Sequence, residues 1–210
     1  MKKSYLIMAS VLVLSSIIYS QGKSSFQFSG GMVYPISSNP GLSGTLQYNY
    51  NINSRFNFFV SADYSVWDKR NFNYIDKSNV HWGYETGYSE SDHTLSRIMA
   101  GGRYLITPSS QFKLFVDAGI GYSYLQYNIY DMHQINNPDG TIEVLFSPAG
   151  KAYQNLFSFS SGIGFIHQIA ERWDILFEYK LSTYLNSQYD GLFSSQSTFS
   201  TFQFGFNYKI

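Results

Sequence analysis

The side chains best suited to acid–base chemistry lie together in one short segment, Glu90-Ser-Asp-His93. General-base catalysis needs a histidine that a carboxylate orients and that lies close to a hydroxyl group or a water molecule. The segment supplies these residue types, but its spacing is not distinctive, and polar loops often contain such clusters by chance. The other histidines, His81, His133 and His167, lie in or beside predicted connections. We therefore expect no catalytic residues, and His93 is the one weak candidate.

Metal ligands are present in the same region, but their spacing does not define a site. His81, Glu85 and His93 could approach one another in a folded loop, yet spacing alone imposes no coordination geometry. A solvated loop is the simpler interpretation, and we expect neither a metal nor a cofactor. The Asn, Asp and Tyr residues of this loop, with Trp82, could equally form a contact surface for a partner or a glycan.

Strands must position these side chains, because the chain after its first ~20 residues alternates with period two and shows no useful helical periodicity. Each segment is at least as long as the ~9–11 residues that a tilted strand needs to cross a membrane, within the error of its boundaries. The eight alternating segments are Ser25–Tyr34, Leu42–Tyr50, Phe56–Trp67, Thr94–Ile106, Phe112–Tyr127, Gln154–Ile166, Trp173–Tyr184 and Phe199–Ile210.

The final segment has the most informative pattern. Its outward set is Phe202, Phe204, Phe206, Tyr208 and Ile210. The residues between them are Gln, Gly, Asn and Lys, so one face is aromatic and the other polar. A barrel strand in an outer membrane has this pattern because one face meets lipid and the other a polar lumen. The outward set also resembles the C-terminal signal that directs bacterial barrels to insertion, although that signal usually ends in Phe.

The charged residues of the strands share the opposite face, which must turn away from lipid because a charge at mid-depth costs ~2–4 kcal/mol. Counting from the inner turns places most of them at similar middle heights, with Arg97 slightly higher. An eight-stranded barrel is only wide enough for side chains to fill, so opposite charges should pair. We predict an ion-paired plug, with an ion pathway or gate as the alternative. The predicted lumen network is Asp63, Arg97, Arg103, Asp117, Glu178 and Lys180.

The connections and the first residues indicate the orientation. Short turns alternate with long polar connections, Asp68–His93 and Asn128–Tyr153, and both ends of the barrel lie on the short-turn side. Asn137-Pro-Asp-Gly140 predicts a tight turn that closes a hairpin above the membrane. Lys2 and Lys3 followed by an apolar run predict a signal peptide over residues 1–22, with cleavage near residues 20–22. Residues 23–210 would then form one exported barrel domain.

Composition excludes some classes of function. Charged residues make up only 13% of the chain against a typical ~25%. This is too few charged residues to cover the surface of a soluble protein well. Aromatic residues, in contrast, reach 19%. The net charge of zero gives no electrostatic case for nucleic acid. Cysteine is absent, so burial and hydrogen bonding must hold an exported domain together.

Taken together, the signal peptide, the eight strands and the aromatic last strand resemble the small outer-membrane β-barrels, of the OmpA/OmpX type and of the beta-barrel domain proteins common in Bacteroidota. The resemblance implies an all-β, eight-stranded antiparallel up-and-down transmembrane barrel with short periplasmic turns and longer extracellular loops. It implies residence in the outer membrane of a Gram-negative cell, contact with outer-membrane lipids, and insertion by the barrel-assembly machinery. An unknown partner could bind the extracellular loops.

The first hypothesis for function is a non-enzymatic protein that is structural, adhesive or surface-interacting. Three alternatives are an outer-leaflet lipid-modifying enzyme, a narrow porin, and a soluble calycin-like barrel that binds an apolar ligand. The last would place apolar residues inside and charges outside.

Overall fold

The computed structural model describes residues 24–36, 38–68, 73–76, 84–108, 111–186 and 198–210. The predicted signal peptide and His81 lie outside these residues. No helix in the described ranges is long and apolar enough to cross a membrane. The described residues form the strands β1 (Ser24–Pro35), β2 (Gly41–Asn51), β3 (Phe56–Trp67), β4 (Asn73–Asp76), β5 (Tyr84–Leu105), β6 (Phe112–Asn136), β7 (Ile142–Gln168), β8 (Trp173–Tyr184) and β9 (Thr198–Lys209).

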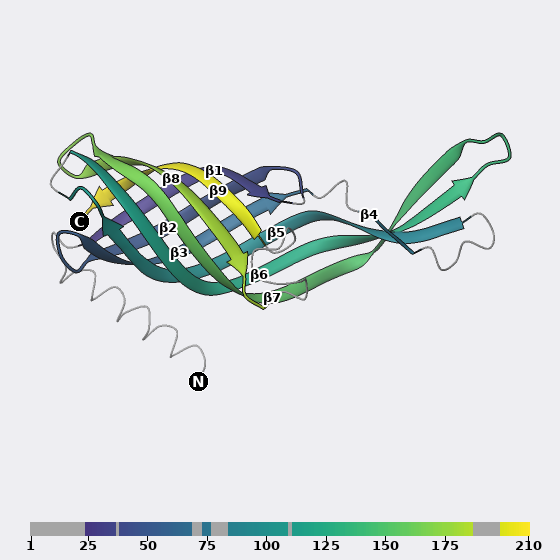
Figure 1. Ribbon diagram of the computed structural model, residues 1–210, viewed down its shortest axis with the longest axis horizontal. Helices are drawn as coiled ribbons and strands as arrows, with labels where there is room; N and C mark the ends of the chain where they lie inside the picture. Colours follow the sequence, from purple (N-terminus) through teal and green to yellow (C-terminus); the bar gives the residue numbers. More distant parts are fainter. Residues whose placement is uncertain (1–23, 37, 69–72, 77–83, 109–110, 187–197) are drawn as a thin grey trace.

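Eight of the strands that the structure describes close into a barrel (Figure 1). The sheet order is β3-β2-β1-β9-β8-β7-β6-β5-β4, and an additional antiparallel pairing of β3 with β5 closes the ring. β4 lies outside the ring and pairs with β5. β1 pairs with β9, so the last strand seals the barrel against the first. The predicted all-β, eight-stranded antiparallel up-and-down barrel is confirmed.

The two faces of the strands are sorted as the alternation predicts. On β9, Phe202 is 51% exposed while the next residue, Gln203, is 3% exposed. On β3, the exposed side chain of Val60 precedes the buried side chain of Ser61. A slip of one residue would exchange these faces along a whole strand, so the pattern fixes the register. Charges lie inside and apolar side chains outside, so the soluble calycin-like interpretation is wrong.

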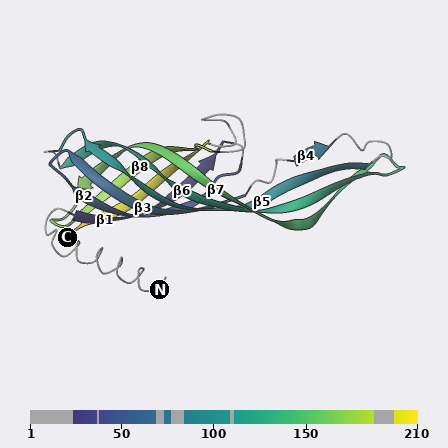
Figure 2. The same cartoon turned by 90° about the horizontal axis from the view of Figure 1, so that it is seen from below.

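Three strands continue well beyond the ring and, with β4, form an extension that we call the blade (Figures 1 and 2). The blade comprises residues 73–76, 84–91, 128–136 and 142–151. β6 and β7 pair as far as Asn136 and Ile142, where the tight turn closes the hairpin that the sequence predicts. In this turn Thr141 donates two hydrogen bonds to the Asp139 carboxylate, which hold the pKa of that carboxyl below its usual value.

The central strands are longer than the sequence predicts. Residues Asp68–His93 were expected to form a polar connection, but β4 lies within this range and β5 begins at Tyr84. β6 and β7 likewise run through most of the predicted connection Asn128–Tyr153. A strand that stands in water on both faces needs no apolar alternation, and the pattern used to find the membrane strands is therefore weak here.

The short turns gather at the barrel end that carries the C-terminus (Figure 1). Ile52 donates its backbone N–H to Phe56 across the first turn, and Ile169 donates to Trp173 across the third. Ile210 donates its N–H to the carbonyl of Ser24, which ties the last residue to the first strand. The blade extends from the opposite end of the barrel. One end of the barrel therefore carries short turns and the other carries the blade.

Candidate functional site

Arg103 lies at the centre of the lumen and is 1% exposed. β5 turns its side chain inward because the next residue, Tyr104, faces outward. Its guanidinium donates to the Asp117 carboxylate at 2.9 Å and to the Glu178 carboxylate at 2.7 Å. The ammonium of Lys180 lies 3.1 Å from the second oxygen of Glu178. These four side chains form a neutral group, two cations with two anions, which we call the central charge cluster.

The remaining two predicted network residues form a second ion pair nearer the outer end. Arg97 Nε donates to Asp63 Oδ2 at 3.3 Å, and its Nη1 donates to the Ser182 hydroxyl at 2.8 Å. Thr45 donates to the other carboxylate oxygen of Asp63 at 2.6 Å. The structure therefore places all six predicted residues in the lumen. Asp63 pairs with Arg97 rather than with the four residues below it, because β3 and β5 put these two opposite each other.

Two aromatic rings lie under the cations, and the sequence analysis missed both. The Arg103 guanidinium carbon lies 3.9 Å from the centre of the Phe115 ring, and Lys180 Nζ lies 5.6 Å from that of Phe59. Cations are attracted to ring faces, more strongly where water is excluded. Inward glycines make room for the rings: a Cβ on Gly164 would lie 2.5 Å from Phe115, and one on Gly101 would lie 2.6 Å from Phe59. Such inward glycines beside an inward aromatic are the sequence signal that could have found them.

Buried amides surround the charges and were also missed. The side-chain oxygen of Gln27 accepts from Arg103 at 2.9 Å and from Gln47 at 3.4 Å. Gln203 donates to the hydroxyls of Ser43 and Thr45 at 3.0 and 2.9 Å. Buried polar groups are stable when they are paired in this way. The amides link the barrel wall to the charges and complete a densely bonded middle layer.

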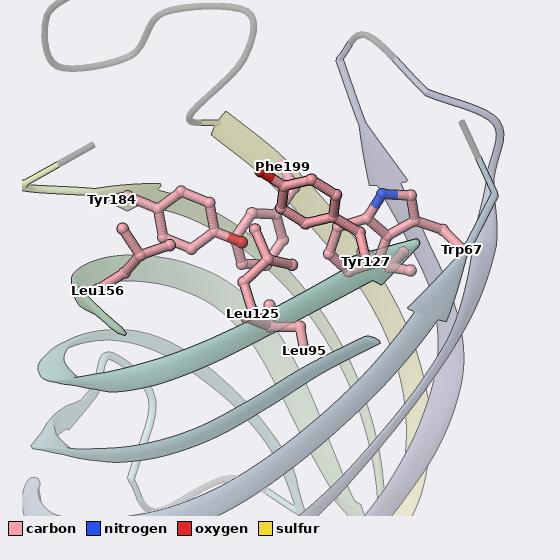
Figure 3. Close-up of a cluster of buried hydrophobic side chains, with 8 residues drawn as sticks. Trp67, Leu95, Leu125, Tyr127, Leu156, Tyr184 and Phe199 are labelled. Carbon is pink, nitrogen blue, oxygen red and sulfur yellow. The ribbon is translucent and has the colours of Figure 1, made fainter. Parts of the chain in front are cut away.

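The outer end of the lumen is apolar rather than polar, which differs from the expected lumen. Figure 3 shows this cluster, which we call the apolar mouth. The cluster is one layer of buried side chains, which are Val33, Trp67, Leu95, Leu125, Tyr127, Leu156, Tyr184 and Phe199. The apolar mouth covers the charges from the outer end of the lumen and withdraws them from water.

His93, the candidate catalytic residue, is enclosed beside this layer and is 4% exposed. Its ring stacks between Trp67 at 5.4 Å and Tyr127 at 5.0 Å, with interplanar angles of 14° and 15°. Asp92, its neighbour in the candidate segment, is exposed and accepts a hydrogen bond from Asn128 at 2.8 Å. The segment straddles an irregularity in the β5–β6 pairing, which separates these two side chains. Stacked aromatic packing is the role that this geometry supports for His93.

No three His, Asp or Glu side chains among the described residues are close enough to hold a metal ion. The side chain of Glu85, like His81, lies outside what the structure describes. His133 is exposed on the blade. His167 lies at the inner end, with its ring 6.5 Å from that of Phe112.

The inner end of the lumen is a vestibule of about 550 Å³ that reaches Arg103 and is lined by both polar and apolar residues. Asn49, Asn57 and Asn207 contribute amides to its lining. Lys209 also lines it, and its ammonium lies 2.7 Å from the Asp174 carboxylate. The vestibule therefore reaches from the inner opening to the central charge cluster, which closes it.

The predicted insertion-signal residues form one outward row on β9. Phe202, Phe204 and Phe206 are exposed, and Tyr208 packs against Trp173 with ring centres 4.8 Å apart. Ile210 follows the strand at the inner end. This placement exposes the row on the outside of the barrel, as contact with lipid would require, and its role as a signal stays a prediction.

Comparison with known proteins places this barrel in a family. The family model described as outer membrane protein beta-barrel domain matches residues 16–209. No protein with a curated description matches the chain.

Solved structures share the fold at low sequence identity. A major outer membrane protein from Thermus thermophilus is 10% identical with a TM-score of 0.53, over 88% of this chain and 98% of that one. Neisserial surface protein A is 12% identical with a TM-score of 0.51, over 89% and 97%. The attachment invasion locus protein Ail of Yersinia pestis is 12% identical with a TM-score of 0.50, over 90% and 98%. With the family match over most of its length, the chain belongs to the outer membrane protein beta-barrel domain family.

Proposed function

We propose that this protein is a non-enzymatic outer-membrane barrel that binds extended segments of other proteins through its blade, while its lumen is closed. The observation that carries the proposal is a long sheet beyond the ring, with exposed apolar side chains and an edge that no described strand pairs with. The enclosed position of His93 supports a non-enzymatic role. The central charge cluster, covered by the apolar mouth, supports a closed lumen rather than a narrow porin.

The blade stands clear of the lipid. β8 crosses the barrel in 12 residues, whereas β6 has 25. The additional residues of β6 extend roughly 40 Å along the strand, at ~3.3 Å per residue. Apolar side chains there meet water instead of acyl chains, so their exposure calls for a partner.

Large apolar side chains are exposed on both faces of the blade. Leu145 and Phe146 are consecutive on β7, so they point to opposite faces, and they are 46% and 52% exposed. Large apolar side chains exposed to water in this way are typical of protein–protein contacts.

The outer part of β7 also offers backbone hydrogen bonds. β7 pairs with β8 from Ser158 to Gln168, and no described strand pairs with this edge above Phe157. Pro148 and a pairing irregularity near Gly150 interrupt the edge, and such features limit indiscriminate strand addition. Residues 143–147 remain as a short regular stretch. A short extended peptide could add to this stretch and place alternate side chains beside Phe146.

Peptide selection tests the blade. We expect wild-type protein in lipid nanodiscs to enrich extended apolar sequences from a random peptide display library. The double variant Leu145→Glu with Phe146→Glu should bind the selected peptides at least about tenfold more weakly, because two apolar contacts are lost. The control Pro138→Glu with Ala149→Glu adds the same two charges at exposed residues outside the stretch 143–147 and should bind as the wild type does. No enrichment over empty nanodiscs, or equal binding by both variants, would contradict the proposal.

A further inference from the structure

The lipid-facing wall of the barrel contains a hollow of about 610 Å³. Gly44 and Ala62 line it, and they leave little side chain where their neighbours are large. Leu46, Tyr64 and Ile98 form its walls. A Cβ on Gly44 would meet only the Ser29 carbonyl oxygen, at an ordinary 3.9 Å. The space above Gly44 is therefore open and directed away from the lumen.

The hollow lies in the outer half of the lipid-facing belt. Gly44 is opposite Tyr64 in the β2–β3 pairing, three residues before the outer end of β3 at Trp67. The inner turn lies at the other end of β3, next to Phe56. The hollow therefore adjoins the outer leaflet, and a hydrocarbon chain that filled it would gain dispersion contacts with its lining.

Polar groups around the hollow can donate hydrogen bonds. Tyr64, Ser96 and Tyr124 bring hydroxyl groups to its lining. Tyr122 donates its hydroxyl to Asn155 Oδ1 at 2.5 Å, so the amide nitrogen of Asn155 is the group that remains to donate. Ester and amide carbonyls of a lipid accept hydrogen bonds and cannot donate through those oxygens. We call these polar groups around the hollow the rim. As hydrogen-bond donors, they are complementary to the carbonyl groups of a lipid.

The rim is also held in place before any lipid binds. Tyr124 stacks on Tyr153 with ring centres 5.9 Å apart. Tyr122 packs edge-on against Phe157 at 6.1 Å. Rigid aromatic side chains lose little conformational entropy on binding, which favours retention of a ligand over exchange.

We propose that this hollow is a specific seat for one acyl chain of an outer-leaflet glycolipid, whose linkage carbonyls accept hydrogen bonds from the rim. The outer-leaflet position selects the glycolipid over inner-leaflet phospholipid. The proposal rests on the placement of the barrel in the outer membrane and is independent of the blade.

Lipid retention tests the seat. Wild-type protein extracted in mild detergent should retain about one glycolipid per chain in native mass spectrometry. Gly44→Leu and Ala62→Leu fill the hollow, and each should lower retention about tenfold because the acyl chain loses its buried contacts. Ala118→Leu is the matched control. It adds apolar bulk to the exposed, lipid-facing side of β6, outside the hollow, and should retain lipid as the wild type does.

Heat-dependent gel mobility reports whether each variant is folded, and either filling variant is sufficient for the comparison. Equal retention by the wild type and a folded filling variant would overturn the proposal. Retention of phospholipid in place of glycolipid would overturn it as well. Wild-type protein that keeps no glycolipid would refute the seat whatever the variants do.

Discussion

Arg103→Met is expected to lower the free energy of unfolding by about 3–5 kcal/mol, because it leaves a buried carboxylate without its cation. In the wild type this guanidinium binds Asp117 and Glu178 and donates to Gln27. Methionine keeps much of the volume but gives the central charge cluster a net charge of −1. Urea unfolding in lipid vesicles, followed by gel mobility, measures the change.

Two further variants separate charge balance from packing. Arg103→Met combined with Asp117→Asn restores neutrality, because Glu178 and Lys180 remain as a pair 3.1 Å apart. We expect this double variant to recover more than half of the lost stability. Arg172→Met at the exposed inner turn should leave the urea midpoint of unfolding close to that of the wild type, because a solvated surface charge contributes little to stability. A double variant no more stable than Arg103→Met would show that the loss comes from packing and not from an unpaired charge.

Val116→Arg should cost about 2–4 kcal/mol, since it places a charge on the lipid-facing side of the part of β6 that lies in the barrel wall. Val116 is outward and lies between Phe112 at the inner end and Tyr122 at the outer ring. Desolvation of the guanidinium in hydrocarbon causes the loss. The same unfolding measurement in vesicles detects it.

The control for Val116→Arg is the same substitution near the membrane surface. Ile106→Arg, on an exposed residue just after the inner end of β5, should cost only about 0–1 kcal/mol because its charge can reach the headgroups. Val116→Leu keeps position 116 apolar and should be nearly neutral. Equal costs for the two arginine variants would contradict the assigned membrane depth.

Much of the barrel could be predicted because the lipid imposes a simple rule on the chain. Outward residues such as Phe204 must be apolar, and inward charges such as Asp117 must face away, so alternation reveals strand, face and register. Outside the lipid this rule disappears. β4 and the first residues of β5 alternate too weakly to be recognised, and pairing across the blade decides their structure.

The lumen was predictable in its charges but not in its apolar parts. An inward position can hold a charged residue such as Arg103. It can equally hold an aromatic residue such as Phe59 or Phe115, where neighbouring glycines make room for the ring. His93 lies at an inward position too, beside Trp67 and Tyr127. Its enclosure depends on three strands meeting at one height, which no local pattern encodes. The residue types near His93 therefore suggested acid–base chemistry, whereas in the structure its ring is stacked between those of Trp67 and Tyr127.

The central claim is that the barrel crosses the outer membrane with a closed lumen and acts through its surface. Single-channel recording of the purified protein in planar bilayers tests this most directly. The central charge cluster and the apolar mouth predict no stable conductance at either polarity. A stable and reproducible conductance of porin size from the wild-type protein would contradict the claim.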